Sequence, residues 1–515
     1  MIEIHCNASP FIFKPILKLL NHLRFEPTTS RGKMILVLLD PFNEKNSLFK
    51  ADSHLTDAQT KEEQIRYLGN VELNSKMIDL ARILATTLKN ETIIFRMSPH
   101  FEMHKLFNTF LKHLKLQTGN EILLSIETDE GKPCHINDIS SKIDSLYYSS
   151  DTKKTENAQA IFDAARICIN TGDYYSGINL LLSIHNLQYD DSLFRTEILS
   201  LLAICHSSID ELKVSVFYWN EVYKQKNYNP QSRSSYALGL MYLRHLPKQF
   251  QDIDLAEKFL NDWYEKLLND KTQDRIRIQF DQVFNRNGYA LAAFKRGKLE
   301  EAQTLVSNGI ATLDEIDSSL SIFHQSVLYY NLAQCYKAKN EIQNVEKTLE
   351  KLIEIDPKFN LYHQYLIEFY IENNMINQAA AAVEDSFKVD QNHLHFHYLK
   401  GKILLLQGDE NNALKAFEAA HQLNPLDTGT LGYLSSLYNS QENYEAVLNC
   451  LKTFHFKFSN EHNGEIIINN LVIALLNDSE RSDEVNALIE ESIGLKPESE
   501  FFQEIAELIK EEYAD

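Results

Sequence analysis

A repeated helix–turn–helix pattern constrains the fold of this chain more than any other feature of its sequence. Residues 394–427 (LHFHYLKGKILLLQGDENNALKAFEAAHQLNPLD) predict two helices separated by a turn at Gly408-Asp409. The second helix must stop at Asn424-Pro425, because proline cannot continue a helix. Small residues stand where the two helices approach closely, and one large residue fills the space between them. The small residues are Gly401, Ala413 and Ala420, and the large one is Phe417.

The same residue types recur at steps of 34 in both directions. The column through Ala413 holds Ala379, Val345 and Val447. The column through Leu404 holds Tyr370, Tyr336 and Tyr438, and the column through Phe417 holds Val383, Leu349 and Leu451. Four units therefore follow one another without a gap over residues 326–461.

This pattern resembles the tetratricopeptide repeat (TPR), a helix–turn–helix of about 34 residues with Gly, Ala, Phe and Pro at fixed offsets. His397 departs from it, because the family places a larger residue near the start of the first helix. The resemblance implies a solenoid of stacked helix pairs, whose concave wall is formed by the first helix of each pair.

The chain as a whole is predicted to be α+β, with three parts. Residues 1–150 alternate apolar runs with helical patterns, which is typical of a small α/β domain with a mostly parallel sheet. Residues 151–497 are predicted to form about eight TPR-like hairpins, and residues 498–515 a capping helix that hides the last apolar face. The N-terminal strands are expected at Ile2–Cys6, Lys33–Asp40, Glu91–Met97 and Glu121–Thr128, and the helices at Phe11–Leu23, Thr56–Leu68, Leu73–Leu88 and Glu102–Leu116. A polar link is expected at Ser140–Lys154.

The net charge of the chain limits the kinds of partner that it is expected to bind. The chain has 515 residues and a formal net charge of −21. Residues 1–150 contain 18 basic and 18 acidic residues, so residues 151–515 carry the whole excess. An acidic repeat surface repels phosphate backbones, so we expect no nucleic-acid binding and instead a basic or amphipathic peptide or protein partner.

Apolar runs and cysteines indicate the compartment. No run approaches the roughly 18–20 apolar residues that a membrane span needs, and the N-terminus shows no signal-peptide pattern. The six cysteines are scattered without a CxxC pair, which is typical of free thiols in a reducing compartment. The expectation is a cytoplasmic protein, and the pattern does not determine its oligomeric state.

The early hairpins, with long Tyr- and Phe-rich first helices, resemble the sensor repeats of regulators related to the maltose activator. Such proteins pair these repeats with a P-loop NTPase domain. Residues 33–40 (KMILVLLD) look like a Walker-B strand ending in Asp40, and Arg96 ends another strand, where such families place a sensor arginine. No GxxxxGK[ST] loop is present, so residues 1–150 would be a degenerate P-loop-like domain that does not hydrolyse ATP.

Other chemical signatures are sparse. His100 and His104 have an i, i+4 spacing that can hold zinc, and Cys134-His135 could add ligands, but nothing in the sequence brings the two pairs together. We find no nucleophile signature and no cofactor fingerprint, so no catalytic residue, metal or cofactor is predicted.

The predicted function is a non-enzymatic scaffold or adaptor that binds a peptide or protein segment on the concave wall of the solenoid. The alternative is a ligand- or nucleotide-responsive regulator with an inactive NTPase-like domain. Helical phase predicts that eleven side chains line the wall: Asn287, Phe294, Tyr330, Gln334, Lys337, Gln364, Glu368, His395, Tyr398, Lys402 and Asn439.

Overall fold

A computed structural model gives the fold of the chain. It describes residues 1–515 except 7–8, 44–45, 47–48, 50–68, 90, 99–102, 120–121, 127–138, 150, 190–191, 226–232, 270–273, 317–318, 453–463, 478–483, 496–498 and 513–515. The described residues form two compact units, Met1–Phe359 and Asn360–Asp515. We refer to them as the N-terminal unit and the C-terminal unit.

The N-terminal unit begins with a small parallel sheet. Its strands β1 (Ile2–Cys6), β2 (Ile93–Met97) and β3 (Ile122–Ile126) lie in the order β1-β2-β3. The side chains of β1 alternate between buried and exposed, as the period of two of a strand requires. Ile2 pairs with Ile93, and Ile93 in turn pairs with Ile122. The three strands lie where the sequence predicts strands.

The strand predicted at Lys33–Asp40 is wrong, because these residues form helix α2 (Ser30–Leu39). A short apolar run fits a buried helix as well as a buried strand, and periodicity alone does not separate them. The local signal for a helix is Thr29, whose side chain caps the N-terminus by accepting a hydrogen bond from the Gly32 amide. Asp40 therefore follows a helix, so its interpretation as a Walker-B carboxylate is wrong as well.

The other N-terminal helices lie close to their predicted positions. They are α1 (Lys14–His22), α5 (Gly69–Leu88) and α6 (Lys105–Thr118). The helix predicted at Thr56–Leu68 lies outside the described residues. The predicted link is largely helical and contains α7 (Ile139–Tyr147) and α8 (Asp151–Glu156). Asp144 of α7 accepts a hydrogen bond from Ser9 and pairs with Lys14, which ties this segment to the N-terminus.

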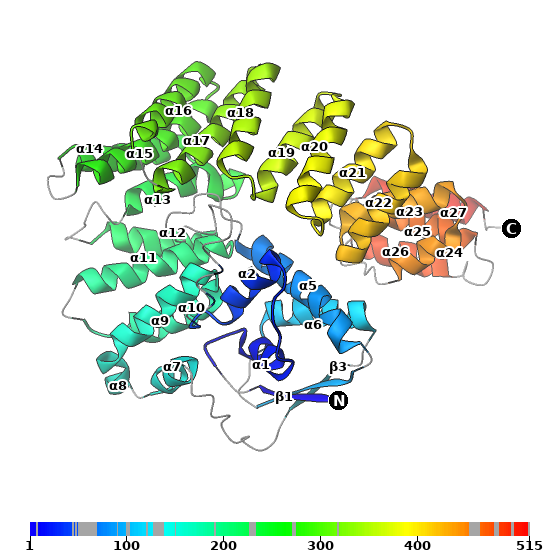
Figure 1. Cartoon of the computed structure of the whole chain (residues 1–515), viewed down its shortest axis with the longest axis horizontal. Helices are drawn as coiled ribbons and strands as arrows, with labels where there is room; N and C mark the ends of the chain where they lie inside the picture. The colour runs from blue at the N-terminus through cyan, green and yellow to red at the C-terminus, as the bar shows by residue number, and fades with distance from the viewer. Residues whose placement is uncertain are drawn as a thin grey trace. The chain divides into compact units, whose positions relative to one another are not determined.

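Antiparallel helix pairs make up the rest of the N-terminal unit, and Figure 1 shows the members of each pair side by side. The pairs are α9 (Ala158–Thr171) with α10 (Tyr174–His185), α11 (Ser192–Ser208) with α12 (Leu212–Tyr223), α13 and the π-helix η2 (Ser234–Leu240, Met241–His245) with α14 (Ile253–Asn269), α15 (Arg275–Lys295) with α16 (Leu299–Asp314), and α17 (Ser319–Ala338) with α18 (Ile342–Ile355). A short 3-10 helix, η3 (Lys248–Phe250), lies in the predicted insertion of the third pair.

Four further pairs and a final helix form the C-terminal unit. They are α19 (Asn360–Glu372) with α20 (Ile376–Val389), α21 (Leu394–Leu406) with α22 (Glu410–Leu423), α23 (Thr428–Ser440) with α24 (Tyr444–Leu451), α25 (Gly464–Leu476) with α26 (Glu484–Leu495), and then α27 (Glu500–Glu512). The described residues thus contain nine helix pairs, one more than the count of about eight drawn from the sequence.

The turn inside each regular pair shows how the period is kept. One residue of each turn has a left-handed backbone, and these residues are Asn340, Asn374, Gly408 and Glu442. They are spaced 34 apart, and only one of them is glycine. Left-handed backbone ends helices and is tolerated by asparagine as well. The repeat is therefore kept in the backbone even where the sequence at the turn varies.

One hydrophobic core runs from Ile2 to Met241 in the N-terminal unit, so it contains residues of the sheet and of the first helix pairs. Polar contacts reinforce it, because the Ile12 amide donates to Ser176 Oγ at 3.1 Å and Asn179 Nδ2 donates to the Pro10 carbonyl at 3.0 Å. The three parts inferred from the sequence, residues 1–150, 151–497 and 498–515, remain a prediction.

The close approach of α21 and α22 depends on Gly401. A Cβ at this position would lie only 2.6 Å from Phe417 Cζ. The Phe417 ring cannot move away freely, because it is fully buried and stacks on Tyr433 with centroids 4.8 Å apart. Glycine is thus required at this contact for its missing side chain.

We expect Gly401→Ala to destabilise the C-terminal unit by about 1–3 kcal/mol, the usual cost of overpacking a well-packed core. This outcome opposes helix propensity, which favours alanine over glycine by about 1 kcal/mol in a helix interior. Urea unfolding followed by circular dichroism measures the change. The double variant Gly401→Ala/Phe417→Leu should recover part of the loss, and additive effects of the two substitutions would contradict the contact.

Candidate protein-binding wall

Tyr398 on α21 is the centre of a cluster of side chains in the C-terminal unit. Its ring centroid lies 5.8 Å from that of His395 on the same helix and 5.7 Å from that of Tyr433 on α23. Lys402 stands one turn further along α21 and places Nζ 5.7 Å from the Tyr398 ring centroid. These side chains are half-buried, so they form a wall that is in contact with solvent.

The Tyr398 hydroxyl lies among oxygen atoms and negative charges. Burial raises the pKa of Tyr398 to about 12, and a hydrogen bond with Tyr433 and the nearby carboxylates of Asp427 and Glu368 act in the same direction. The hydroxyl therefore remains protonated at neutral pH. It can donate one hydrogen bond and accept others.

The two carboxylates are positioned by their own helices. Glu368 on α19 accepts a hydrogen bond from Gln364 Nε2 at 2.9 Å, one turn earlier on the same helix. Asp427 is the N-cap of α23, and its Oδ1 accepts hydrogen bonds from the Thr430 amide and hydroxyl at 3.4 and 3.2 Å. Gly429 brings the start of α23 close to Tyr398, because a Cβ there would be in van der Waals contact with the Tyr398 ring at 3.4 Å and with Asp427 Oδ1 at 3.5 Å. We call this set the Tyr398 wall: Gln364, Glu368, His395, Tyr398, Lys402, Asp427 and Tyr433.

A second polar group lies on α23 and α25. Asn439 Nδ2 donates to the Asn470 carbonyl at 3.0 Å, and Asn470 Nδ2 donates to both Ser435 Oγ and Ser436 Oγ at 2.9 Å. Asn439 Oδ1 is buried and accepts no hydrogen bond among the described residues. The side chain of Asn439 is thus held in place by the neighbouring repeat.

The predicted wall residues of the N-terminal unit are less uniform. Asn287 is buried and accepts a hydrogen bond from Asn331 Nδ2 at 2.7 Å, while Phe294 is half-buried against a small cluster around Ala302. Tyr330 lies near the guanidinium of Arg244, whose pKa is lowered by burial and partly restored by the neighbouring tyrosines. On the same helix as Tyr330, Gln334 is half-buried and Lys337 is exposed.

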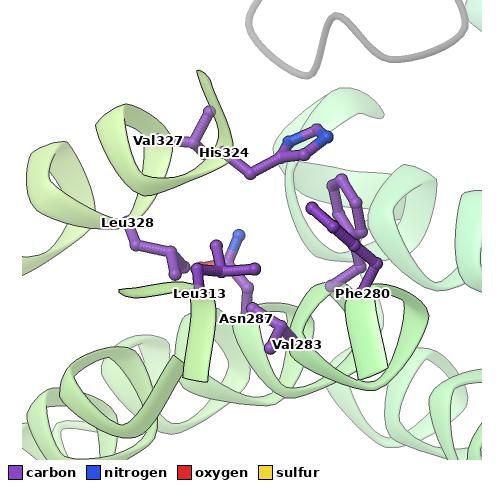
Figure 2. A pocket seen from close by; sticks show the side chains of 8 residues that line it. Phe280, Val283, Asn287, Leu313, His324, Val327 and Leu328 are labelled. Carbon is purple, nitrogen blue, oxygen red and sulfur yellow. The ribbon is translucent and has the colours of Figure 1, made fainter. Parts of the chain in front are cut away.

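Asn287 also lines a small hollow between α15, α16 and α17, which Figure 2 shows. Apolar side chains form most of its lining, and the His324 ring packs edge-on against Phe284 with centroids 4.2 Å apart. The hollow has a volume of only about 10 Å³, which is room for about one water molecule. Pockets for small molecules typically hold about 300–1,000 Å³, so this hollow is small for a ligand site.

The structure thus brings together Gln364, Glu368, His395, Tyr398 and Lys402 of the eleven predicted residues. Sequence reasoning missed Tyr433, Asp427 and Asn470. Asn470 lies one repeat period after Ser436, so a further step along the repeat would have found it. Asp427 carries the signal of an N-cap before a helix. Tyr433 lies one residue before Leu434, which belongs to a packed column of the repeat. The helical phase of Tyr433 did not predict a place on the wall.

The histidine pair predicted as a zinc candidate is only partly described. His104 is the N-cap of α6, and its ring packs at a tilt of 58° against Tyr175 with centroids 4.2 Å apart. Burial, with a smaller effect of Lys105, lowers the pKa of His104 to about 4. His100, Cys134 and His135 lie outside the described residues. Arg96 pairs with Glu3 on the neighbouring strand, with Nη2 3.0 Å from Oε1.

A comparison with protein families now adds to this geometry. The sequence model of the tetratricopeptide repeat matches residues 327–359 and 394–425. Each of these segments is a helix pair with one of the regularly spaced turns. The chain thus contains tetratricopeptide repeats. No curated protein matches its sequence, and no comparison supports the resemblance of its early pairs to maltose-activator-like regulators.

Solved structures of other TPR proteins are similar to the chain at low identity. A tetratricopeptide repeat protein from Parabacteroides merdae is 13% identical, with 55% of this chain and 100% of that chain covered and a TM-score of 0.37. YrrB, described as a TPR protein with an unusual peptide-binding site, is 15% identical over 42% and 97%, with a TM-score of 0.28. The Cut9-Hcn1 hetero-tetramer of the APC/C is 11% identical over 69% and 84%, with a TM-score of 0.31. All three TM-scores are below 0.5.

The chain departs from its own repeat at Lys400, where the other regular units have leucine. Lys400 Nζ lies 2.7 Å from Glu384 Oε1 and 5.4 Å from the centre of the Phe387 ring. Both partners belong to α20, so the lysine replaces an apolar contact between repeats with an ion pair and a cation–π contact. None of the described helices of this TPR protein is long and apolar enough to cross a membrane.

Proposed function

We propose that this TPR protein is a non-enzymatic interaction scaffold, and that the Tyr398 wall binds an extended segment of a partner protein. The observation that carries the proposal is the convergence of polar and aromatic side chains from α19, α21 and α23 around one half-buried tyrosine. TPR repeats support the coarser role of protein–protein interaction. The wall adds a place where such an interaction could be specific.

The chemistry of the wall suits a peptide. An extended peptide presents alternating amide N–H and carbonyl groups, which the side chains of Gln364, Tyr398 and Tyr433 can accept or donate to. Tyrosine also dominates the energy of many interfaces, because it buries a large ring and still makes a hydrogen bond. Tyr398 is therefore the expected hot spot.

The position of Asp40 does not support the alternative function, a nucleotide-responsive regulator. This alternative depended on Asp40 at the end of a strand, and Asp40 follows helix α2 instead. No observation in the described residues favours nucleotide binding over peptide binding, so we propose a single function.

Photo-crosslinking in the cells that make the protein tests the proposal. A benzophenone amino acid in place of Lys402 should capture a partner protein, whereas the same group in place of Lys415 should not. Lys415 is the matched control, because it is an exposed lysine on the second helix of the same pair. Adding Tyr398→Ala should reduce capture at position 402 by about tenfold or more, the effect of losing a hot-spot side chain.

A second variant separates binding from folding. Tyr398→Phe keeps the ring contacts with Phe417 and Tyr433 but loses the hydroxyl, so we expect a smaller reduction than with alanine. Circular dichroism confirms that each variant is folded. Equal capture at positions 402 and 415, or capture unchanged by Tyr398→Ala, would contradict a binding role for the wall.

A further inference from the structure

The charge of the protein is concentrated in the C-terminal unit. Residues 360–515 contain 26 acidic and 9 basic residues, whereas residues 1–359 contain 46 acidic and 42 basic residues. The unit that holds the Tyr398 wall thus carries most of the net charge. Such a field attracts cationic segments and repels anionic ones over a distance of about 8–10 Å at physiological salt.

Two carboxylates of the wall itself are available to a ligand. The ion pairs of the C-terminal unit join Lys388 to Asp385 and Lys400 to Glu384. Among the described residues, neither Glu368 nor Asp427 forms an ion pair, and each uses one oxygen in a hydrogen bond within its own helix. Half-buried carboxylates that form no ion pair are a favourable site for a cation.

The N-terminus of α23 brings Asp427 beside Tyr398. Gly429 has no side chain, and both the Tyr398 ring and Asp427 Oδ1 lie about 3.5 Å from the point where a Cβ would stand. The hydroxyls of Tyr398 and Tyr433 add oxygen atoms that can accept hydrogen bonds near these carboxylates. Lys402 Nζ lies 5.7 Å from the centre of the Tyr398 ring, and among the described residues it forms no ion pair with either carboxylate.

We infer that the Tyr398 wall is specific for a basic segment, and that a lysine or arginine side chain of the partner pairs with Glu368 and Asp427 next to the Tyr398 hydroxyl. This inference rests on the proposed function and names the chemical class of the partner. An ammonium group has three N–H donors and a guanidinium has five, so each can bind a carboxylate and a tyrosine hydroxyl together. An acidic segment would meet repulsion from both the wall and the unit.

Selection from a displayed library of random 12-residue peptides tests the inference, with the full-length protein as bait. Three baits are compared: wild type, Glu368→Gln/Asp427→Asn, and the control Glu410→Gln/Asp385→Asn. The wall variant removes two charges and keeps local structure, because glutamine still accepts from Gln364 and asparagine is a good N-cap. The control removes two charges from exposed positions on second helices.

We expect the wild-type protein to enrich peptides that share a lysine or arginine at one fixed position of the selected sequence. A peptide so selected, synthesised with a fluorescent label, should bind the wall variant about tenfold more weakly by anisotropy, and its affinity should depend less steeply on salt. The control variant should change the affinity by less than about twofold, since exposed charges contribute little.

The other outcomes separate the two proposals. Enriched peptides without a basic preference, whose binding still requires Tyr398, would overturn the inference and leave the scaffold function standing. An equal loss of peptide affinity in the wall and control variants would also overturn the inference, because the charge of the C-terminal unit as a whole would then attract the peptide. No peptide enriched by wild type over Tyr398→Ala would contradict peptide binding by this wall.

Discussion

Replacing Phe417 with alanine is expected to lower the free energy of unfolding of the C-terminal unit by about 3–5 kcal/mol, the usual range for a buried phenylalanine. Phe417 is fully buried, and its ring touches the Gly401 backbone, stacks on Tyr433 and packs edge-on against Tyr398. It therefore connects α21, α22 and α23. Its removal leaves a cavity at the junction of two repeats, which neighbouring side chains fill only in part.

Hydrogen exchange measured by mass spectrometry can locate this loss. Amides of α21, α22 and α23 should exchange faster in Phe417→Ala, because repeats are stabilised mainly by their neighbours. Leu406→Ala is the matched control, since Leu406 is 55% exposed at the end of α21 and such positions usually change stability by less than about 0.5 kcal/mol. Similar effects of the two substitutions would show that Phe417 does not have this role.

Asp173→Asn is expected to stabilise the N-terminal unit at neutral pH. Asp173 is the N-cap of α10, its side chain is almost fully buried, and it accepts a hydrogen bond from the Ser176 amide at 3.0 Å. Burial raises the pKa of Asp173 to about 7, against an ordinary value of 3.8. Asparagine keeps the cap without a charge.

The sign of the pH dependence follows from that shift. Between pH 4 and 7 the folded chain retains a proton that the unfolded chain has lost, so the stability contributed by Asp173 falls as the pH rises through this range and is constant above it. The advantage of Asp173→Asn over wild type should therefore grow from pH 4 to pH 7, by an amount on the order of 4 kcal/mol.

Urea unfolding at a series of pH values measures this difference. The two tryptophans of the chain, Trp219 and Trp263, both lie in the N-terminal unit, so their fluorescence reports on its unfolding. Asp252→Asn is the matched control, because Asp252 accepts from the Leu255 amide at an exposed helix start in the same unit. A gain that does not vary between pH 4 and 7, or one that Asp252→Asn reproduces, would contradict the role of burial.

Much of the fold could be predicted because the repeat is encoded locally. Gly401, Ala413 and Phe417 mark a helix contact inside a single helix pair, and the regular spacing of the repeat then assigns every similar contact. The error at Lys33–Asp40 has the opposite origin. Its apolar run carries no period, so its helical state depends on the cap at Thr29 and on Arg31, whose guanidinium pairs with Glu72 and Asp79 of α5.

The candidate site was less predictable, because it combines residues from different repeats. Helical phase correctly grouped Gln364 with Glu368, and His395 with Tyr398, since members of each pair lie on one helix face. It also assigned Asn287 to the wall, whereas the neighbouring Asn331 covers it. Helical phase gives the direction of a side chain on its own helix only, and Asn331, which contacts Asn287, belongs to another helix.

The sequence by itself determined the helix pairs, their period and the acidic character of the C-terminal unit, because these follow from residue spacing and residue count. Only the tertiary structure decided which carboxylates lie beside Tyr398 and that the start of α23 at Gly429 approaches its ring. The reason is that a cluster of this kind depends on the stacking of one repeat on the next. A stacking geometry is set by side-chain packing across repeats, which no single stretch of the chain contains.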